Sequence, residues 1–528
     1  MPLPQFTQRF LDRLPGDPRT DLAPRQVAGA LWSRVAPTPV AAPRMLSYSV
    51  PLARELGLDD TLLRDPATAA VLSGNALWPG MAPYAANYGG HQFGHWAGQL
   101  GDGRAIVLGE LQRADGARFE LQLKGAGPTP YSRRGDGRAV LRSSLREFLC
   151  SEAMFHLGVP TTRALSLCTT GDAVVRDMFY DGNAQHEPGA IVCRVAPSFL
   201  RFGNFELPSS RGDVALLRQL AEFTLAEHFP QHLPTAGAPA KDHYAAWFYD
   251  VAERTARTIA HWQAIGFVHG VMNTDNLSIL GLTIDYGPYG WIDDFDLGWT
   301  PNTTDAQQRR YAFGNQPGIG LWNLERLGVA LLPLFDDDEQ VVHQGLEAFR
   351  TTYGTEASRR FAAKLGLQFR PELGDGTLLQ DLFTWLGEAE TDMTIWFRAL
   401  SAAVVLPTLP MELPTALLAA SYAPMAPARA ATGLAWLQRW WQRTRAEAAT
   451  PTALAVAMDA VNPWFVLRNW VAQEAIEAAH AGDASKLQTL LVAIERPFTV
   501  QPEVAHWATK RPEWARSKPG CSALSCSS

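Results

Sequence analysis

Apolar and polar side chains alternate along the first part of the chain and recur with a helical period along the second part. The segment 104–111 is apolar enough for a strand, and the segment 118–124 alternates polar and apolar residues as a half-buried strand does. An Asp-Gly pair lies between them, so we expect a hairpin. Two further apolar runs, at 173–180 and 190–207, predict additional strands.

Helical spacing of apolar residues begins at residue 141. The apolar side of a predicted helix over 141–157 consists of Leu141, Leu145, Phe148, Leu149 and Phe155. Two more helices are predicted at 213–229 and 240–265, and one face of the second consists of Trp247, Val251, Thr255, Ile259 and Trp262. From Leu321 onward the pattern is almost wholly helical, with Trp and Leu stripes typical of packed helices.

These patterns predict an α+β protein in several parts. Residues 1–80 are rich in Pro and Ala, with short helical patterns, and predict an extension packed on the main body. The other parts are a strand-rich region (81–210), a region of two long helices and a loop-rich segment (211–320), a helical C-terminal region (321–515) and a flexible tail (516–528).

Composition narrows the class of protein. The chain has 528 residues, 47% of them hydrophobic and 19% charged, as in ordinary globular proteins. Its net charge of −7 and pI of about 6.0 argue against nucleic acid or an anionic membrane as the main partner. Neither a leader pattern nor an apolar run of about 18 residues is visible, so we expect a cytoplasmic protein. We also expect a monomer.

The cysteines fall into two groups. Cys150, Cys168 and Cys193 lie within strand or helix patterns and are expected to be small buried hydrophobes. Cys521 and Cys526 lie in a Ser/Gly/Pro-rich tail, where we expect exposed, mobile thiols that are candidates for redox chemistry. The alternative is that they are inert tail thiols.

The segment 269–294 carries the strongest chemical signal. Asp275 and Asn276 follow a long predicted helix, and two brief apolar runs, 277–280 and 282–284, are expected to form a two-stranded hairpin that ends at Asp285. An amide and a carboxylate brought together in this way are suitable ligands for Mg²⁺ or Mn²⁺ carrying a nucleotide phosphate. Asn276 and Asp285 are therefore predicted metal ligands, with Asp275 as a proton acceptor. The alternative is that these residues mark surface turns.

A second signal is a lysine at the end of a strand followed by a glutamate on a helix. Lys124 ends the strand 118–124, and Glu147 lies on the helix 141–157. Gly101 and Gly103 precede the hairpin, where glycines allow the backbone to approach a nucleotide closely. Kinases hold nucleotide phosphates with such a lysine and glutamate beneath a glycine-rich hairpin. The alternative for Lys124 is a solvated charge at the end of a strand.

Arginines supply the third signal. Arg194 and Arg201 lie seven residues apart in the apolar run 190–207, where a buried cation needs an anionic partner. We favour a polyphosphate clamp over an internal salt bridge. The polar loop between Lys124 and the helix 141–157, which contains Asp136, is expected to be fixed at a ligand.

Six segments together resemble the selenoprotein O family, in a form with cysteine where some members carry selenocysteine, at Cys526. They are residues 87–105, 121–149, 192–206, 269–293, 462–470 and 525–528. The resemblance implies a bilobal protein-kinase-like fold, with lobes at 81–210 and 211–320, that transfers AMP from ATP to Ser, Thr or Tyr hydroxyls of other proteins.

The resemblance also implies roles for single residues. Nucleotide contacts would come from Gly101, Gly103, Arg104, Lys124, Asp136, Gly137, Arg194, Arg201 and Asp285, with Glu147 pairing Lys124. Asn276 and Asp285 would hold the metal, and Asp275 would be the general base. From the residues alone, a kinase of ordinary regiochemistry and a nucleotide-binding pseudokinase scaffold remain open, because nothing in the spacing tells which phosphorus is attacked.

Overall fold

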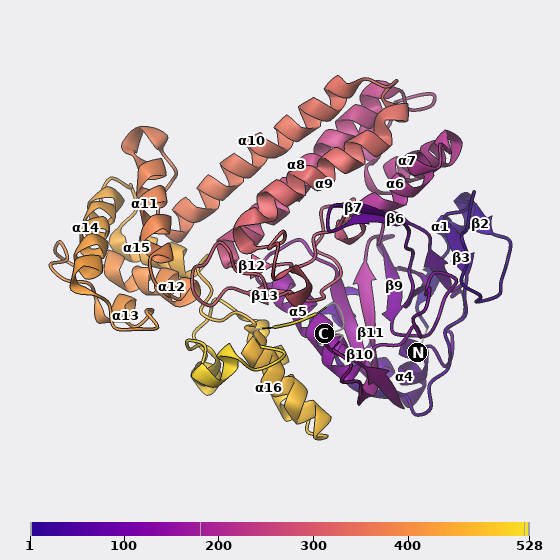
Figure 1. Cartoon of the computed structure of the whole chain (residues 1–528), viewed down its shortest axis with the longest axis horizontal. Coiled ribbons are helices and arrows are strands. Elements are labelled where there is room, and N and C mark those ends of the chain that lie inside the picture. The colour runs from indigo at the N-terminus through magenta and orange to yellow at the C-terminus, as the bar shows by residue number, and fades with distance from the viewer. Residues whose placement is uncertain (1–2, 180, 522, 526–528) are drawn as a thin grey trace.

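The computed structural model describes residues 3–179, 181–521 and 523–525, and it places one large sheet beside an extensive helical region (Figure 1). The strands of this sheet run in the order β2-β3-β5-β8-β9-β11-β10-β4, with β1 paired to β8. They are β1 Gln5–Thr7, β2 Gly16–Asp17, β3 Trp32–Arg34, β4 Arg44–Tyr48, β5 Tyr84–Ala86, β8 Ala105–Gln112, β9 Arg118–Lys124, β10 Arg163–Arg176 and β11 Gln185–Ala196. Two short pairs lie outside it, namely β6 Gly89–Gln92 with β7 His95–Gln99, and β12 Phe267–Val268 with β13 Gly290–Trp291.

The described residues of the first half of the chain form eight α-helices, some of which pack on the sheet. They are α1 Arg9–Arg13, α2 Val50–Glu55, α3 Asp60–Arg64, α4 Pro66–Leu72, α5 Leu141–His156, α6 Phe202–Ser210, α7 Val214–His228 and α8 Lys241–Ile265. The second half is helical, as predicted. Its helices are α9 Gln316–Leu331, α10 Glu339–Lys364, α11 Asp375–Gly387, α12 Met393–Val404, α13 Thr415–Leu418, α14 Pro427–Thr444, α15 Pro451–Asp459, α16 Asn469–His480 and α17 Ser485–Ile494.

Alternation along β9 sorts its side chains between a core and a cavity. Leu121 and Leu123 are fully buried in the core on one face, whereas Gln122 and Lys124 lie on the other. The neighbouring strand β11 is antiparallel, with Arg194 opposite Gln122. The strand pattern therefore places three polar side chains together on the inner face of the sheet.

Helix α5 packs against β10 and β11 and fixes Glu147 behind the sheet. Four of the five predicted apolar positions are buried, but Phe155 is 41% exposed, so its assignment to the core is wrong. Phe155 lies in the last turn of the helix, where the Arg163 guanidinium covers its ring at 3.4 Å. A cation over the aromatic face takes the place of an apolar partner there.

Helices α8, α9 and α10 pack side by side and form the long arm at the top of Figure 1. The predicted inner face of α8 is buried at all five positions, which confirms the helical pattern there. Helices α11 to α15 form a separate group on the left, and their core around Phe397 and Trp440 also includes residues of α10 and of the segment 292–313. The α+β class is thus confirmed. Among the described residues, no helix is both long and apolar enough to cross a membrane.

The segment 197–207 was predicted to continue a strand and does not. Strand β11 ends at Ala196, and α6 begins at Phe202 with Arg201 as its N-cap residue. The side chain of Asn204 accepts a hydrogen bond from the backbone N–H of Arg201 at 2.8 Å, which stabilises the first turn. Arg201 therefore stands at a helix start and not in a strand.

The two apolar runs 277–280 and 282–284 also do not form a regular hairpin. A single bridge joins Leu277 to Thr283, around a turn at Gly281, while Ser278 and Thr283 form bridges with other segments. The pair β12 and β13 instead closes the ends of the loop, since Val268 lies opposite Gly290. The ends of the segment 269–294 are held close as expected, but by different residues.

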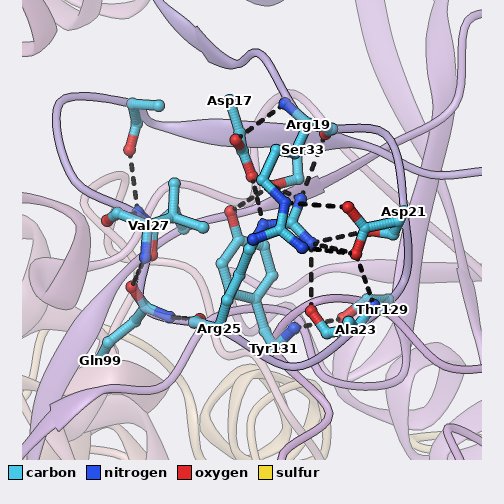
Figure 2. A network of polar contacts seen from close by, with 12 residues as sticks. Asp17, Arg19, Asp21, Ala23, Arg25, Val27, Ser33, Gln99, Thr129 and Tyr131 are labelled. Carbon is cyan, nitrogen blue, oxygen red and sulfur yellow. Dashed lines mark hydrogen bonds and ion pairs between the residues drawn. The ribbon is translucent and has the colours of Figure 1, made fainter.

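The N-terminal segment contributes strands that its composition did not predict. Figure 2 shows its connection to the rest of the fold, a polar network in which Arg25 pairs with Asp17 at 2.6 Å. The Ser33 hydroxyl lies 3.0 Å from the same carboxylate and 2.8 Å from the Tyr131 hydroxyl, and the side-chain amide of Gln99 donates to the Arg25 carbonyl. The segment thus contacts the start of the β7–β8 loop through Gln99 and the loop before α5 through Tyr131.

Candidate active site

A cavity of about 720 Å³ collects nearly all the residues singled out from the sequence. The predicted residues that line it are Gly101, Gly103, Arg104, Lys124, Asp136, Gly137, Arg194, Arg201, Asp275, Asn276 and Asp285. They come from the β7–β8 loop, from β9 and β11, from the start of α6, from the loop before α5 and from the segment after β12. Side chains far apart in sequence therefore share one solvent-connected space.

Lys124 and Glu147 form the ion pair that their spacing predicted. Lys124 Nζ lies 2.7 Å from Glu147 Oε2, and Glu147 is only 2% exposed because α5 carries it behind the strand. Burial lowers the pKa of Lys124, although the Glu147 carboxylate opposes that shift. Arg194 contacts the other oxygen of Glu147 at 3.2 Å, so one glutamate orients two cations toward the cavity.

Arg194 and Arg201 converge on Asp285. Arg194 Nη1 lies 2.5 Å from Asp285 Oδ1, and Arg201 pairs with the other carboxylate oxygen. Burial alone would raise the pKa of Asp285, but Arg201, Arg194 and Lys124 outweigh it and hold that pKa well below its usual range. The internal salt bridge considered as the alternative for the arginines is thus present, at the edge of the cavity, and the phosphate clamp stays a prediction.

Asp275 lies in a short 3₁₀ turn, Thr274–Asn276, beneath the β6–β7 hairpin. Its Oδ2 accepts a hydrogen bond from the side-chain amide of Gln92 at 3.1 Å, and its Oδ1 is buried with no hydrogen-bond partner among the residues that the structure describes. A Cβ at Gly90 would lie 2.8 Å from that Oδ1, so only glycine allows this approach. Burial raises the pKa of Asp275 to about 7. A carboxylate of that basicity suits proton transfer near neutral pH.

The residues around Asn276 can be tested for their fit to a divalent cation. The Asn276 amide nitrogen donates to the Val271 carbonyl at 2.9 Å, which leaves the amide oxygen as the group able to ligate. Among the described residues there is no group of three or more His, Cys, Asp or Glu side chains placed so that they could hold a metal ion. Mg²⁺ commonly takes one or two protein oxygens and completes its shell with phosphate oxygens and water. Asn276 and Asp285 fit that kind of site.

The glycine-rich loop and the loop before α5 are pressed together at the mouth of the cavity. A Cβ at Gly101 would lie 2.4 Å from the Tyr131 ring, and one at Gly137 would lie 2.1 Å from the Gly127 backbone. Both glycines also have a positive φ. Asp136 is fixed by a pair with Arg176 at 2.7 Å, which lowers the pKa of its carboxyl.

Several residues of the site were missed by sequence reasoning. Gln92 contacts Asp275, Gln122 contacts Arg194, and Asp102 lies 3.9 Å from Arg201. The available signals were a polar residue flanked by leucines, at Gln122, and a carboxylate between two glycines, at Asp102. Neither signal is specific without knowledge of which strands are neighbours.

The cysteine predictions have mixed outcomes. Cys150, Cys168 and Cys193 are fully buried, as expected. Cys521 is only 6% exposed, so the expectation of an exposed thiol is wrong for it. Its segment is docked, because the Asn469 side chain donates to the Cys521 carbonyl at 3.0 Å. Cys526 lies outside the described residues, and its redox role stays a prediction.

Comparisons with known proteins identify the family to which the chain is similar. The sequence profile of the family described as protein adenylyltransferase SelO matches residues 23–495. A protein from Xanthomonas campestris pv. campestris (strain B100), named protein nucleotidyltransferase YdiU, is 59% identical over 99% of both chains. A protein of the same name from Aromatoleum aromaticum is 57% identical over 98% of both.

One similar solved structure is ROP2 from Toxoplasma gondii, described as a virulence factor with a protein-kinase fold and no enzymatic activity. Its sequence identity is 12% and its TM-score 0.23, over 57% of this chain and 87% of that one.

The chain is therefore a protein nucleotidyltransferase, an enzyme of the transferase class. Within that class it belongs to the SelO family of protein adenylyltransferases, because the family profile covers most of its length and the relatives match it from end to end.

Proposed function

We propose that this chain transfers AMP from ATP to the Ser, Thr or Tyr hydroxyls of other proteins, with Mg²⁺ or Mn²⁺ held by Asn276 and Asp285. The observation that supports it most strongly is the convergence of Lys124, Arg194 and Arg201 with Asp275 and Asp285 on one cavity. The three cations can bind the phosphates of a triphosphate. One of the two carboxylates can ligate a metal ion and the other can accept a proton.

The cations have the task of binding and aligning the triphosphate. Lys124, Arg194 and Arg201 donate charge-assisted hydrogen bonds, which are worth about 1.5–3 kcal/mol each. Arg194 and Arg201 leave the Asp285 oxygens as they take phosphate oxygens. A cation at Asn276 and Asp285, when bound, supplies further neutralisation of the phosphates.

Asp275 has the task of moving the proton. The acceptor hydroxyl forms a bond to the α-phosphorus, the bond between that phosphorus and the bridging oxygen breaks, and pyrophosphate leaves. The hydroxyl proton passes to the Asp275 carboxylate. Because the cavity wall buries that carboxylate, its raised pKa makes it a stronger base than an exposed aspartate.

The test follows which phosphorus is transferred. Purified protein is incubated with a protein acceptor and ATP labelled at either the α or the γ phosphorus, and covalent label is measured. We expect label from α only, attached as AMP and absent from Asp285→Ala. Label from γ only would establish a kinase instead, and undiminished transfer by Asp285→Ala would remove this residue from the site.

A further inference from the structure

A layer of buried polar residues lies directly behind the arginine pair and takes no part in the function proposed above. Gln122, on β9, is fully buried, and its side-chain oxygen accepts a hydrogen bond from Arg194 Nη2. Its side-chain nitrogen donates to Asp102 Oδ2 at 3.3 Å. Gln122 thus joins the arginine of β11 to a carboxylate of the glycine-rich loop.

Asp102 is 3% exposed and is surrounded by donors. Its Oδ1 accepts from the Tyr88 hydroxyl at 3.2 Å, and its Oδ2 also accepts from the Ala86 backbone N–H at 3.1 Å. Arg201 Nη2 lies 3.9 Å from the same carboxyl, with its guanidinium over the Tyr88 ring. The groups that hydrogen-bond to its two oxygens are all donors, so this side chain accepts in a fixed orientation.

The orientation of Asp102 decides which end of Gln122 meets Arg194. A carboxamide has one accepting and one donating end, and Asp102 binds the donating end. The accepting oxygen is therefore left facing Arg194, whereas a reversed amide would present N–H groups to a guanidinium. Asp102 and Gln122 together favour one position of the Arg194 side chain.

This support becomes decisive when phosphate is bound. In the structure both arginines are also held by Asp285. Once they leave Asp285 for phosphate, the hydrogen-bond partners left to Arg194 among the described side chains are Glu147 and Gln122, and Glu147 is already engaged by Lys124. Without Gln122, Arg194 would be free to turn from the cavity toward Glu147.

We propose that Gln122, oriented by Asp102, is a positioning residue that holds Arg194 toward the triphosphate of the nucleotide. This inference rests on the proposed use of the cavity for ATP. It identifies the β-γ end of the nucleotide as the part whose binding depends on the buried layer. Adenosine lacks the phosphates that Arg194 is proposed to bind, so its binding should not depend on Arg194.

The test compares two probes by calorimetric titration of the full-length protein in the presence of Mg²⁺, one a non-hydrolysable ATP analogue and the other adenosine. Gln122→Leu keeps the volume of the side chain but removes both hydrogen bonds. We expect about tenfold weaker binding of the ATP analogue, equal to about 1.4 kcal/mol, and unchanged binding of adenosine. Gln112→Leu, at the end of β8 and outside the cavity, is the matched control and should alter neither.

A second variant tests the orienting role. Asp102→Asn should weaken binding of the ATP analogue to a similar extent. Because both residues act through one bridge, the double variant should lose no more affinity than whichever single variant loses more. Unchanged or tighter binding in Gln122→Leu, or equal losses for both probes, would overturn the proposal. Lys124→Ala distinguishes failure of the positioning role of Gln122 from failure of the proposed nucleotide site. If it weakens the ATP analogue while Gln122→Leu does not, only this inference fails, and if neither does, the nucleotide site itself is wrong.

Discussion

The side-chain amide of Gln92 lies 3.1 Å from Oδ2 of Asp275, although 183 positions separate the two residues in the chain. The contact belongs to a wider attachment of the β6–β7 hairpin to the loop that carries Asp275. The backbone N–H of His91 donates to the Thr274 hydroxyl at 2.7 Å, and that of Phe93 donates to the Asn273 side chain at 3.2 Å. The hairpin therefore holds three consecutive residues of the loop in place.

Replacement of Gln92 by Ala should lower kcat for AMP transfer and leave the KM for ATP unchanged. A hydrogen bond to a charged group contributes about 1.5–3 kcal/mol, so we expect a loss of roughly tenfold to a hundredfold. His95→Ala, an exposed position on the same hairpin, is the control and should have wild-type kinetics. A rise in kcat in Gln92→Ala would mean that the amide obstructs the acceptor instead of orienting the carboxylate.

Asp275→Asn should change how stability depends on pH in the metal-free protein. Burial raises the pKa of Asp275 from 3.8 in the unfolded chain to about 7 in the folded protein. Folding therefore favours the protonated form, and its contribution to stability is complete below pH 3.8 and is lost as the pH rises through about 7. Asn cannot ionise, so the melting temperature of the variant should rise relative to wild type between pH 5 and pH 8.

The measurement is thermal unfolding in EDTA at both pH values. Asp115→Asn, at an exposed turn, serves as the control and should run parallel to wild type over this range, since Arg113 lowers the pKa of Asp115 to about 2. Parallel melting curves for Asp275→Asn and wild type would show that this carboxyl does not titrate within the interval.

The sequence predicted which charged residues share the cavity better than it predicted the strands and loops that hold them in place. The pairing of Lys124 with Glu147 followed from strand and helix periods, because a period fixes which face a residue occupies. The strands of the first 48 residues were missed, since each is only two to five residues long and carries no alternation that stands out from a Pro-rich background.

Arg201 shows a second limit. An apolar run without a strong break continued past Ala196 in the sequence, and only the reciprocal contact between Arg201 and Asn204 shows where the helix begins. Gln92 and Asp102 could not be found at all in this way. Their partners lie on strands and loops that only the whole fold, and not the local pattern, brings close to them.

Lys124→Ala should leave the protein folded and weaken its use of ATP. Loss of one partner of a buried ion pair usually destabilises strongly, but Glu147 retains Arg194 at 3.2 Å and so is not left without a cation. We expect a KM for ATP roughly tenfold to a hundredfold higher, from the loss of a charge-assisted contact with phosphate. Circular dichroism checks the fold. An unfolded variant, or one with unchanged nucleotide kinetics, would show that Lys124 serves structure alone.

The docked C-terminal segment should protect Cys521 from thiol reagents. Burial raises the pKa of Cys521 to about 11, roughly two units above an ordinary thiol, so its thiolate fraction near pH 8 should be roughly a hundredfold smaller. Leu524 anchors this segment, because it is fully buried and its backbone N–H donates to the Pro301 carbonyl at 3.0 Å. Leu524→Ala should cost about 2–5 kcal/mol if the site does not collapse, and should speed alkylation of Cys521.

The experiment uses a Cys526→Ser background, so that the second tail thiol does not contribute, and follows modification of Cys521 by mass spectrometry. Val500→Ala, at a position 57% exposed, is the control for a change of similar kind outside the docked segment. We expect slow modification in the background protein and in the control, and faster modification in Leu524→Ala. If Cys521 of the background protein reacts as fast as in urea, the segment does not stay docked in solution, and the original expectation of an exposed thiol is restored.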